Sequence, residues 1–216
     1  MEAVKAEINK IPRSLSKQAR RKQLIEATIK CIADKGLSGT TMADVTQLAG
    51  LSLGIVNLHF QTKEKLLIET LSYISDEYTS GLNKIFYDKN LNTEQKILAH
   101  INFDFSRKII DRNKLAVWFA FWGETKSRPT YLSICASYIN EIANNLTALF
   151  ALLKQEGNYT KVDPELVCTC YTAVCDGLWL DLLMTPKGLK PAQAQSVAMH
   201  YLATQFPNHL KTRTGI

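Results

Sequence analysis

Residues 41–67 read TMADVTQLAGLSLGIVNLHFQTKEKLL, and this stretch contains two short helical patterns separated by a glycine. The first pattern starts with TMAD, which matches a helix-capping signature, and it ends at Gly50. The second follows Ser52, a good N-cap residue, and runs to about His59. Two short helices joined by a tight glycine turn have the form of a helix-turn-helix. An ordinary helical hairpin, which uses the same turn chemistry, is the alternative.

The two glycines of this stretch need an explanation, because a glycine inside a helix costs about 1 kcal/mol relative to alanine. Gly50 is expected to adopt the positive φ that the turn requires. Gly54 has no side chain and would let the first turn of the second helix approach a partner closely. The free N–H groups that follow Ser52 would bind a DNA phosphate. The stretch therefore predicts a DNA-binding function.

The helical period divides the second helix into an inner and an outer face. Ile55 and Leu58 are expected to pack inward, with Leu48 of the first helix. On the outer face, Leu53 would touch a thymine methyl and Asn57 would bind a base edge or a phosphate. The full set of predicted DNA contacts is Thr41, Ser52, Leu53, Gly54, Val56, Asn57, His59 and Lys63.

Positive charge is concentrated at the amino-terminal end of the chain. The formal net charge is +6, and residues 1–65 carry +5 of it, because they hold 11 Lys/Arg and 6 Asp/Glu. A basic first third on a near-neutral remainder is typical of a polyanion-binding head attached to a body with another task. A solvated basic tail is the alternative.

Helix punctuation recurs along the chain and strand signals are nearly absent, so the predicted fold class is all-α. A three-helix domain is expected at residues 15–62 and a helical body at residues 63–208. The first helix would run from about Ser16 to Lys35 and stop at Gly36. Later helices are expected at residues 63–86, 93–111, 114–126, 129–156, 164–185 and 191–206.

Other classes of protein are disfavoured by what the sequence lacks. The longest apolar run, at residues 115–122, is too short to cross a membrane, and no secretory signal is recognised, so we expect a cytoplasmic protein without membrane contact. Five cysteines without a CxxC pair favour reduced core residues. The four histidines form no catalytic or metal-ligand pattern, so we expect neither an enzyme nor a metal or cofactor.

Three tryptophans stand out in the body. Trp118 and Trp122 are four residues apart and share a helix face, and Trp179 lies three residues after Asp176. Aromatic faces beside a carboxylate suit a quaternary ammonium ion, which cannot donate hydrogen bonds. Aromatic residues at helical spacing also form ordinary core, so periodicity alone leaves both interpretations open.

The order T-x-A-D-V-x-x-x-A-G-L-S-x-G-x-x-x-x-H-F-x-x-K-E-x-L-L resembles the DNA-binding signature of the tetracycline-repressor (TetR) family of bacterial regulators. The resemblance covers about residues 20–67. It implies that the protein binds double-stranded operator DNA and that the body, residues 63–208, binds a small molecule and dimerises. The family usually has tyrosines where this chain has Asn57 and His59, which suggests altered operator contacts.

Three segments of the body, NFD at 102–104, WFAFW at 118–122 and DGLWL at 176–180, resemble the BetI branch of that family. Members of this branch repress genes that convert choline to glycine betaine, and choline releases them from DNA. The resemblance implies a pocket for choline or a related quaternary ammonium. Its candidate residues are Trp118, Phe121, Trp122 and Trp179 in the wall and Asp104 or Asp176 as the anionic partner. A regulator that senses another apolar or cationic compound, such as a drug or lipid, is the alternative.

Two apolar rows near the carboxyl end predict a homodimer through residues 164–185 and 191–206. Paired across a two-fold axis, the two helices of each chain would form a four-helix bundle. The rows are Val167, Tyr171, Val174, Leu178 and Leu182, then Ala194, Val197, Ala198, Tyr201 and Leu202. The expected function is a homodimeric, ligand-responsive repressor, rather than an all-α enzyme or a non-specific architectural DNA binder.

Overall fold

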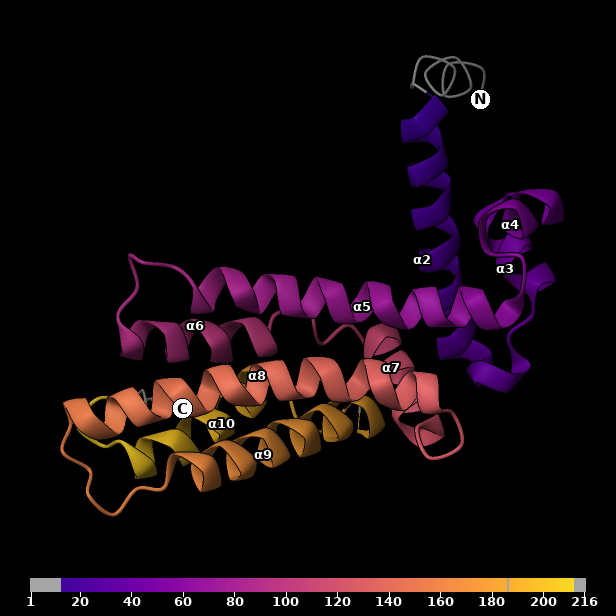
Figure 1. Ribbon diagram of the computed structural model, residues 1–216. Coiled ribbons are helices and arrows are strands. Elements are labelled where there is room, and N and C mark those ends of the chain that lie inside the picture. Colours follow the sequence, from indigo (N-terminus) through magenta and orange to yellow (C-terminus); the bar gives the residue numbers. More distant parts are fainter. Residues whose placement is uncertain (1–12, 186, 212–216) are drawn as a thin grey trace, which may run out of the picture. The chain divides into compact units, whose positions relative to one another are not determined.

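The computed structural model describes residues 13–185 and 187–211, and within these ranges it contains helices and no strands. The predicted all-α class is confirmed. Figure 1 labels the helices, whose bounds are α2 Arg13–Gly39, α3 Met42–Ala49, α4 Leu53–Phe60, α5 Lys63–Phe86, α6 Thr93–Asp104, α7 Arg112–Glu124, α8 Pro129–Glu156, α9 Pro164–Met184 and α10 Pro191–Gln205.

The chain divides into two compact units, residues 1–73 and residues 74–216. The division lies within α5, so this helix begins in the unit that holds the helix-turn-helix and continues into the helical body. The functional boundaries expected from the sequence, 15–62 and 63–208, stay predictions.

The first unit begins with α2, which Gly36 interrupts. This residue has φ 71° and ψ 173°, outside the helical region and in a region that glycine alone enters readily. Thr40 then donates its hydroxyl proton to the Gly36 carbonyl oxygen at 2.8 Å. The predicted end of the first regular helix at Gly36 is confirmed, although a further turn extends to Gly39.

The helices of the body mostly follow the predicted boundaries, and those of α5 and α8 agree with them. The helix predicted at 93–111 is too long, because α6 ends at Asp104. Residues 105–110 form turns, and the Asp111 side chain then accepts hydrogen bonds from the backbone N–H groups of Asn113 and Lys114 and caps α7.

Within the second unit, α9 packs against α7, α8 and α10. Length and composition alone would allow α9 to cross a membrane. One side of α9 is buried in the body, whereas Leu166, Leu180 and Met184 are exposed. The buried residues of α9 are Val167, Cys168, Tyr171, Cys175, Trp179 and Leu182. All five cysteines of the chain are free thiols.

Candidate DNA-binding surface and ligand pocket

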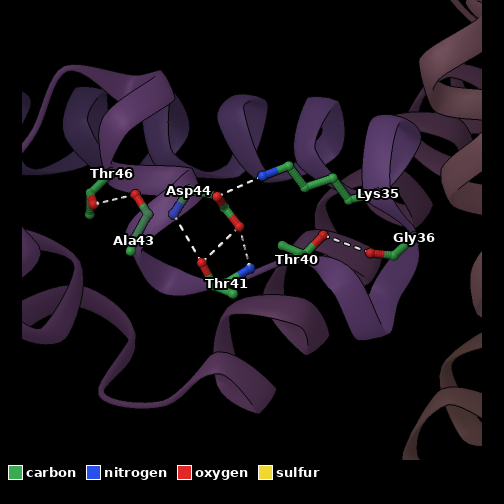
Figure 2. Close-up of polar contacts among 7 residues, drawn as sticks. All are labelled: Lys35, Gly36, Thr40, Thr41, Ala43, Asp44 and Thr46. Carbon is green, nitrogen blue, oxygen red and sulfur yellow. Dashed lines mark hydrogen bonds and ion pairs between the residues drawn. The ribbon is translucent and has the colours of Figure 1, made fainter.

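A reciprocal cap fixes the start of α3, as predicted from TMAD. Figure 2 shows that the Thr41 hydroxyl donates to Asp44 Oδ2 at 2.7 Å and accepts the Asp44 backbone N–H at 3.1 Å. Lys35 Nζ lies 2.7 Å from Asp44 Oδ1, and this ammonium, followed by Thr41, lowers the pKa of the Asp44 carboxyl. The Thr41 hydroxyl proton thus has a partner within the fold, and its contact with DNA stays a prediction.

The turn between α3 and α4 has the predicted geometry at Gly50. Its φ of 64° and ψ of 30° place it in the left-handed region, and its N–H bonds to carbonyl oxygens at the end of α3. Ser52 takes the extended N-cap conformation, but its side chain makes no capping hydrogen bond among the described residues. Backbone N–H groups at the start of α4 are therefore available to an anion.

The two faces of α4 differ from the prediction. Val56 is 0% exposed and Phe60 is 2% exposed, whereas Leu58 is 74% exposed and Leu53 is 50% exposed. The expectation that Val56 faces DNA is wrong, as is the expectation that Leu58 packs inward. The expected burial of Leu48 is also wrong, since this side chain is exposed.

The difference arises because the rest of the first unit covers the side of α4 that carries Phe60. Phe60 is the largest side chain of this helix and occupies the core, so the residue four positions earlier, Val56, lies on the same face. Leu58 is two positions from each and points away from them. The exposed side of α4 therefore carries Leu53, Gly54, Asn57 and Leu58.

Basic residues surround the end of α4. Burial lowers the pKa of His59, and the positive charges of Lys17, Arg21 and Arg20 lower it further. Arg21 also forms an ion pair with Glu69. Lys63 donates to the Ser38 carbonyl oxygen at 3.0 Å, so this predicted phosphate contact has a partner in the fold. The positive field near His59 is suited to a polyanion.

The second unit contains a pocket of about 110 Å³. Five helices contribute to its wall: α5, α6, α7, α8 and α9. Five of its lining residues are tyrosines or tryptophans, a sixth is His100, and two are carboxylates. The lining residues are Tyr78, His100, Asp104, Trp122, Tyr138, Ile139, Ile142, Leu146, Tyr171, Thr172, Cys175, Asp176 and Trp179.

One carboxyl group of the pocket wall, Asp104, is buried. Tyr78 donates its hydroxyl proton to Asp104 Oδ1 at 2.7 Å, and His100 Nδ1 lies 3.4 Å from Asp104 Oδ2. Tyr171 Oη lies 3.3 Å from the same histidine nitrogen. Desolvation raises the pKa of Asp104, and His100 and Tyr78 partly oppose this effect. An ionised Asp104 would be stabilised by a cation in the pocket.

Asp176 is the second carboxylate of the pocket and is exposed to solvent at its surface. Its pKa is raised to about 6, first because the surrounding protein desolvates the carboxyl and second because Asp104 carries a like charge. A cation between the two would relieve this repulsion.

The structure brings four of the six predicted pocket residues together: Trp122, Trp179, Asp104 and Asp176. Trp118 lies behind the wall, with its ring centroid 5.1 Å from Tyr138 and 6.2 Å from Trp122. Phe121 is fully buried against Tyr131 and does not line the pocket. Both side chains are buried in the core and neither lines the pocket.

Sequence reasoning missed the tyrosines of the pocket. Tyr78 packs edge-on against Trp179 at 5.6 Å, and Tyr138 accepts the Trp122 Nε1–H at 2.6 Å. Tyr171 was assigned to the dimer surface but is buried within its own chain. Each lies in a different helix without a local motif, so no spacing signal could have united them.

The predicted dimer rows are also mostly buried in the single chain. Ala194, Ala198 and Leu202 are fully buried, as are three of the five positions on α9. A different row of α9 is exposed, at positions that repeat every three to four residues. This row consists of Leu166, Thr169, Ala173, Gly177, Leu180 and Met184.

Residues 93–207 match the family described as BetI-type transcriptional repressor, C-terminal, and residues 24–70 match the bacterial regulatory proteins of the tetR family. The chain belongs to the TetR family. Its relatives include the HTH-type transcriptional regulator BetI of Escherichia coli K12, 26% identical over 203 residues that cover 91% of this chain and 99% of that protein. BetI of Klebsiella pneumoniae is 27% identical over 88% of this chain and 95% of its own length.

Solved structures share the fold of this TetR-family chain. A transcriptional regulator from Pseudomonas aeruginosa PAO1 has a TM-score of 0.76 at 24% identity and covers 95% of this chain and 98% of its own. A regulator from Saccharomonospora viridis in complex with choline also has a TM-score of 0.76, at 16% identity, over 86% of this chain and 96% of its own.

Membership establishes the general function. The protein is a TetR-family transcriptional repressor and not an enzyme, and regulators of this family bind operator DNA and small-molecule effectors and dimerise. Among the residues that the structure describes, no group of three or more His, Cys, Asp or Glu side chains is arranged to hold a metal ion.

Proposed function

We propose that this regulator represses genes that convert choline to glycine betaine and that choline, or a closely related quaternary ammonium, releases it from operator DNA. The observation that carries the proposal is the pocket of the second unit, where aromatic rings and two carboxylates meet. The BetI relatives and the choline-bound regulator of the same fold support it.

The chemistry of the pocket favours a small cation without hydrogen-bond donors. Trp122, Trp179 and Tyr78 supply aromatic rings to the wall, and each cation-π contact with a ring face is worth about 0.5–2 kcal/mol, depending on desolvation. Asp104 and Asp176 supply negative charge. A volume of about 110 Å³ suits a small ion better than a bulky drug or lipid, which is the alternative effector class.

The pocket also offers a hydrogen-bond donor. The Trp179 Nε1–H is buried and has no partner among the described residues. An indole nitrogen only donates, so a ligand atom that satisfies it must be an acceptor. The choline hydroxyl oxygen is such an atom, and tetramethylammonium has none. A buried donor without a partner costs about 1–3 kcal/mol, which gives the ligand a gain on binding.

We place the working protein in the cytoplasm as a homodimer whose two α4 helices enter major grooves about 34 Å apart. The exposed row of α9 and Val197 of α10 supply apolar surface for the partner subunit. The small residues Ala173 and Gly177 permit close approach of two helices. Release requires only that the effector bind more tightly to the state that does not fit the operator.

A gel-shift titration with choline, glycine betaine, tetramethylammonium and uncharged 3,3-dimethylbutanol tests the proposal. Choline should release specific DNA at the lowest concentration, and the uncharged isostere should fail. Asp104→Asn and Asp176→Asn should weaken release, with Asp181→Asn as a matched control on α9 that does not line the pocket. Release by the isostere as readily as by choline would refute the cation site.

A further inference from the structure

The exposed side of α4 is unusual for a surface that meets a polyanion, because it carries no charge. Its side chains are Leu53, Asn57 and Leu58, with Gly54 between them, and α4 contains neither Lys nor Arg. At about 100° per residue these positions form one continuous arc of about 140°, which runs from Leu53, beside Phe60 on the helical wheel, to Leu58, opposite Val56 and Phe60. The two leucines therefore belong to a single surface.

The occupant of this surface is DNA. The family function requires a DNA partner, and the field of Lys17, Arg20 and Arg21 near the end of α4 attracts one. Phosphate contacts supply most of the non-specific affinity and carry no sequence information. The uncharged arc of α4 contributes little to this non-specific affinity, so we assign its side chains to base edges.

We infer that α4 reads an A·T-rich half-site, with Leu53 and Leu58 on thymine methyl groups and Asn57 on an adenine edge. The thymine C5-methyl is the apolar group that the major groove offers to a leucine, and asparagine pairs in bidentate fashion with adenine N6 and N7. A leucine over a G·C pair would leave the polar atoms of that pair without partners.

The distance between Leu53 and Leu58 along α4 sets the distance between the two thymine methyl groups that they contact. Leu53 and Leu58 are five residues apart, which is about 7.5 Å along the helix axis. Base pairs repeat about every 3.4 Å, so the two leucines reach thymines about two base pairs apart. Asn57 lies between them on the arc and reads an adenine within the same short segment.

The inference rests on operator binding, which is one half of the proposed function, and does not depend on the effector. Full-length protein is first used to select operators from a random pool of DNA duplexes. Each thymine of the selected half-site is then replaced by uracil, which removes only the methyl group. Wild-type protein should lose about fourfold in affinity at each of two positions, the value of one buried methyl.

Two alanine variants show which leucine contacts which thymine of the operator. Leu58→Ala should abolish the preference for thymine over uracil at one position, and Leu53→Ala should abolish it at the other. Both side chains are exposed, so the fold should tolerate the change. Leu48→Ala is the matched control, because Leu48 is an exposed leucine of α3 and should keep both preferences.

Equal affinity of the wild type for thymine and uracil at every position would overturn the inference, as would unchanged preferences in both alanine variants. Selection that yields no specific sequence would refute operator recognition itself. Failure of choline to release the selected operator would refute the effector alone and leave the α4 assignment in place.

Discussion

The two units of this protein assemble their functional residues in opposite ways. The proposed DNA-reading surface lies on the exposed side of one short helix, α4. The pocket takes residues from five helices, between Tyr78 and Trp179, and most of them are buried. A surface built within one helix is set by local periodicity, whereas a buried pocket depends on how distant segments pack.

The largest effect should come from the core of the first unit. Phe60→Ala removes a ring that is 2% exposed and should lower the free energy of unfolding by about 3–5 kcal/mol, with loss of operator binding. All three tryptophans lie in the second unit, so quenching of their fluorescence by choline should persist. Loss of quenching in the variant would show that the two units do not act separately.

A truncation in the pocket should weaken choline binding and leave operator binding in place. Trp122→Ala removes a ring face and should raise the dissociation constant for choline about tenfold, which corresponds to one strong cation-π contact. Isothermal titration with choline measures this. Phe119→Ala is the control, because Phe119 packs edge-on against Trp122 but does not line the pocket. Equal losses in both variants would argue for a general packing defect.

The pocket should bind cations more weakly in acid. A cation favours the ionised form of a carboxyl group, so Asp176, whose pKa is about 6, must lose its proton when choline binds below that pH. Affinity should be nearly constant above pH 7 and fall up to about tenfold per unit below pH 6. Choline titrations from pH 5 to pH 8 measure this, and Asp176→Asn should flatten the profile. A wild-type profile that rises in acid would contradict the assignment.

The smallest predicted effect is on stability, which alanine should lower at Gly50 and raise at Gly54. Gly50 has a φ of 64°, so Gly50→Ala should destabilise the first unit by about 1 kcal/mol. A Cβ on Gly54 would meet only Ser52 Oγ, at 3.8 Å, so Gly54→Ala should stabilise α4 by up to about 1 kcal/mol. Thermal unfolding measures both changes.

Measurements of operator binding then show whether a glycine is needed for the fold or for contact with DNA. Gly54→Ala should weaken binding despite a more stable fold, if the first turn of α4 approaches the duplex closely. Unchanged affinity in this variant would mean that Gly54 has no role at the DNA surface.

Much of the fold was predictable from residues close in sequence. Thr41 and Asp44 cap α3, Gly50 turns the chain, and prolines begin α8, α9 and α10, because each of these effects acts within one helical turn. The orientation of α4 was not predictable in the same way. This helix has five apolar residues, and only packing against the rest of the first unit decides that Val56 and Phe60 are buried and Leu58 is exposed.

The sequence by itself determined the all-α class, the helix-turn-helix and the family, since caps, turns and a contiguous signature are local properties. The tertiary structure alone decided which aromatic residues form the pocket, which carboxylate is buried and which row of α9 stays exposed. Those features depend on contacts between Tyr78, Asp104 and Trp179, residues from three different helices. Burial of a side chain is a property of the packed chain, and periodicity within one helix cannot specify it.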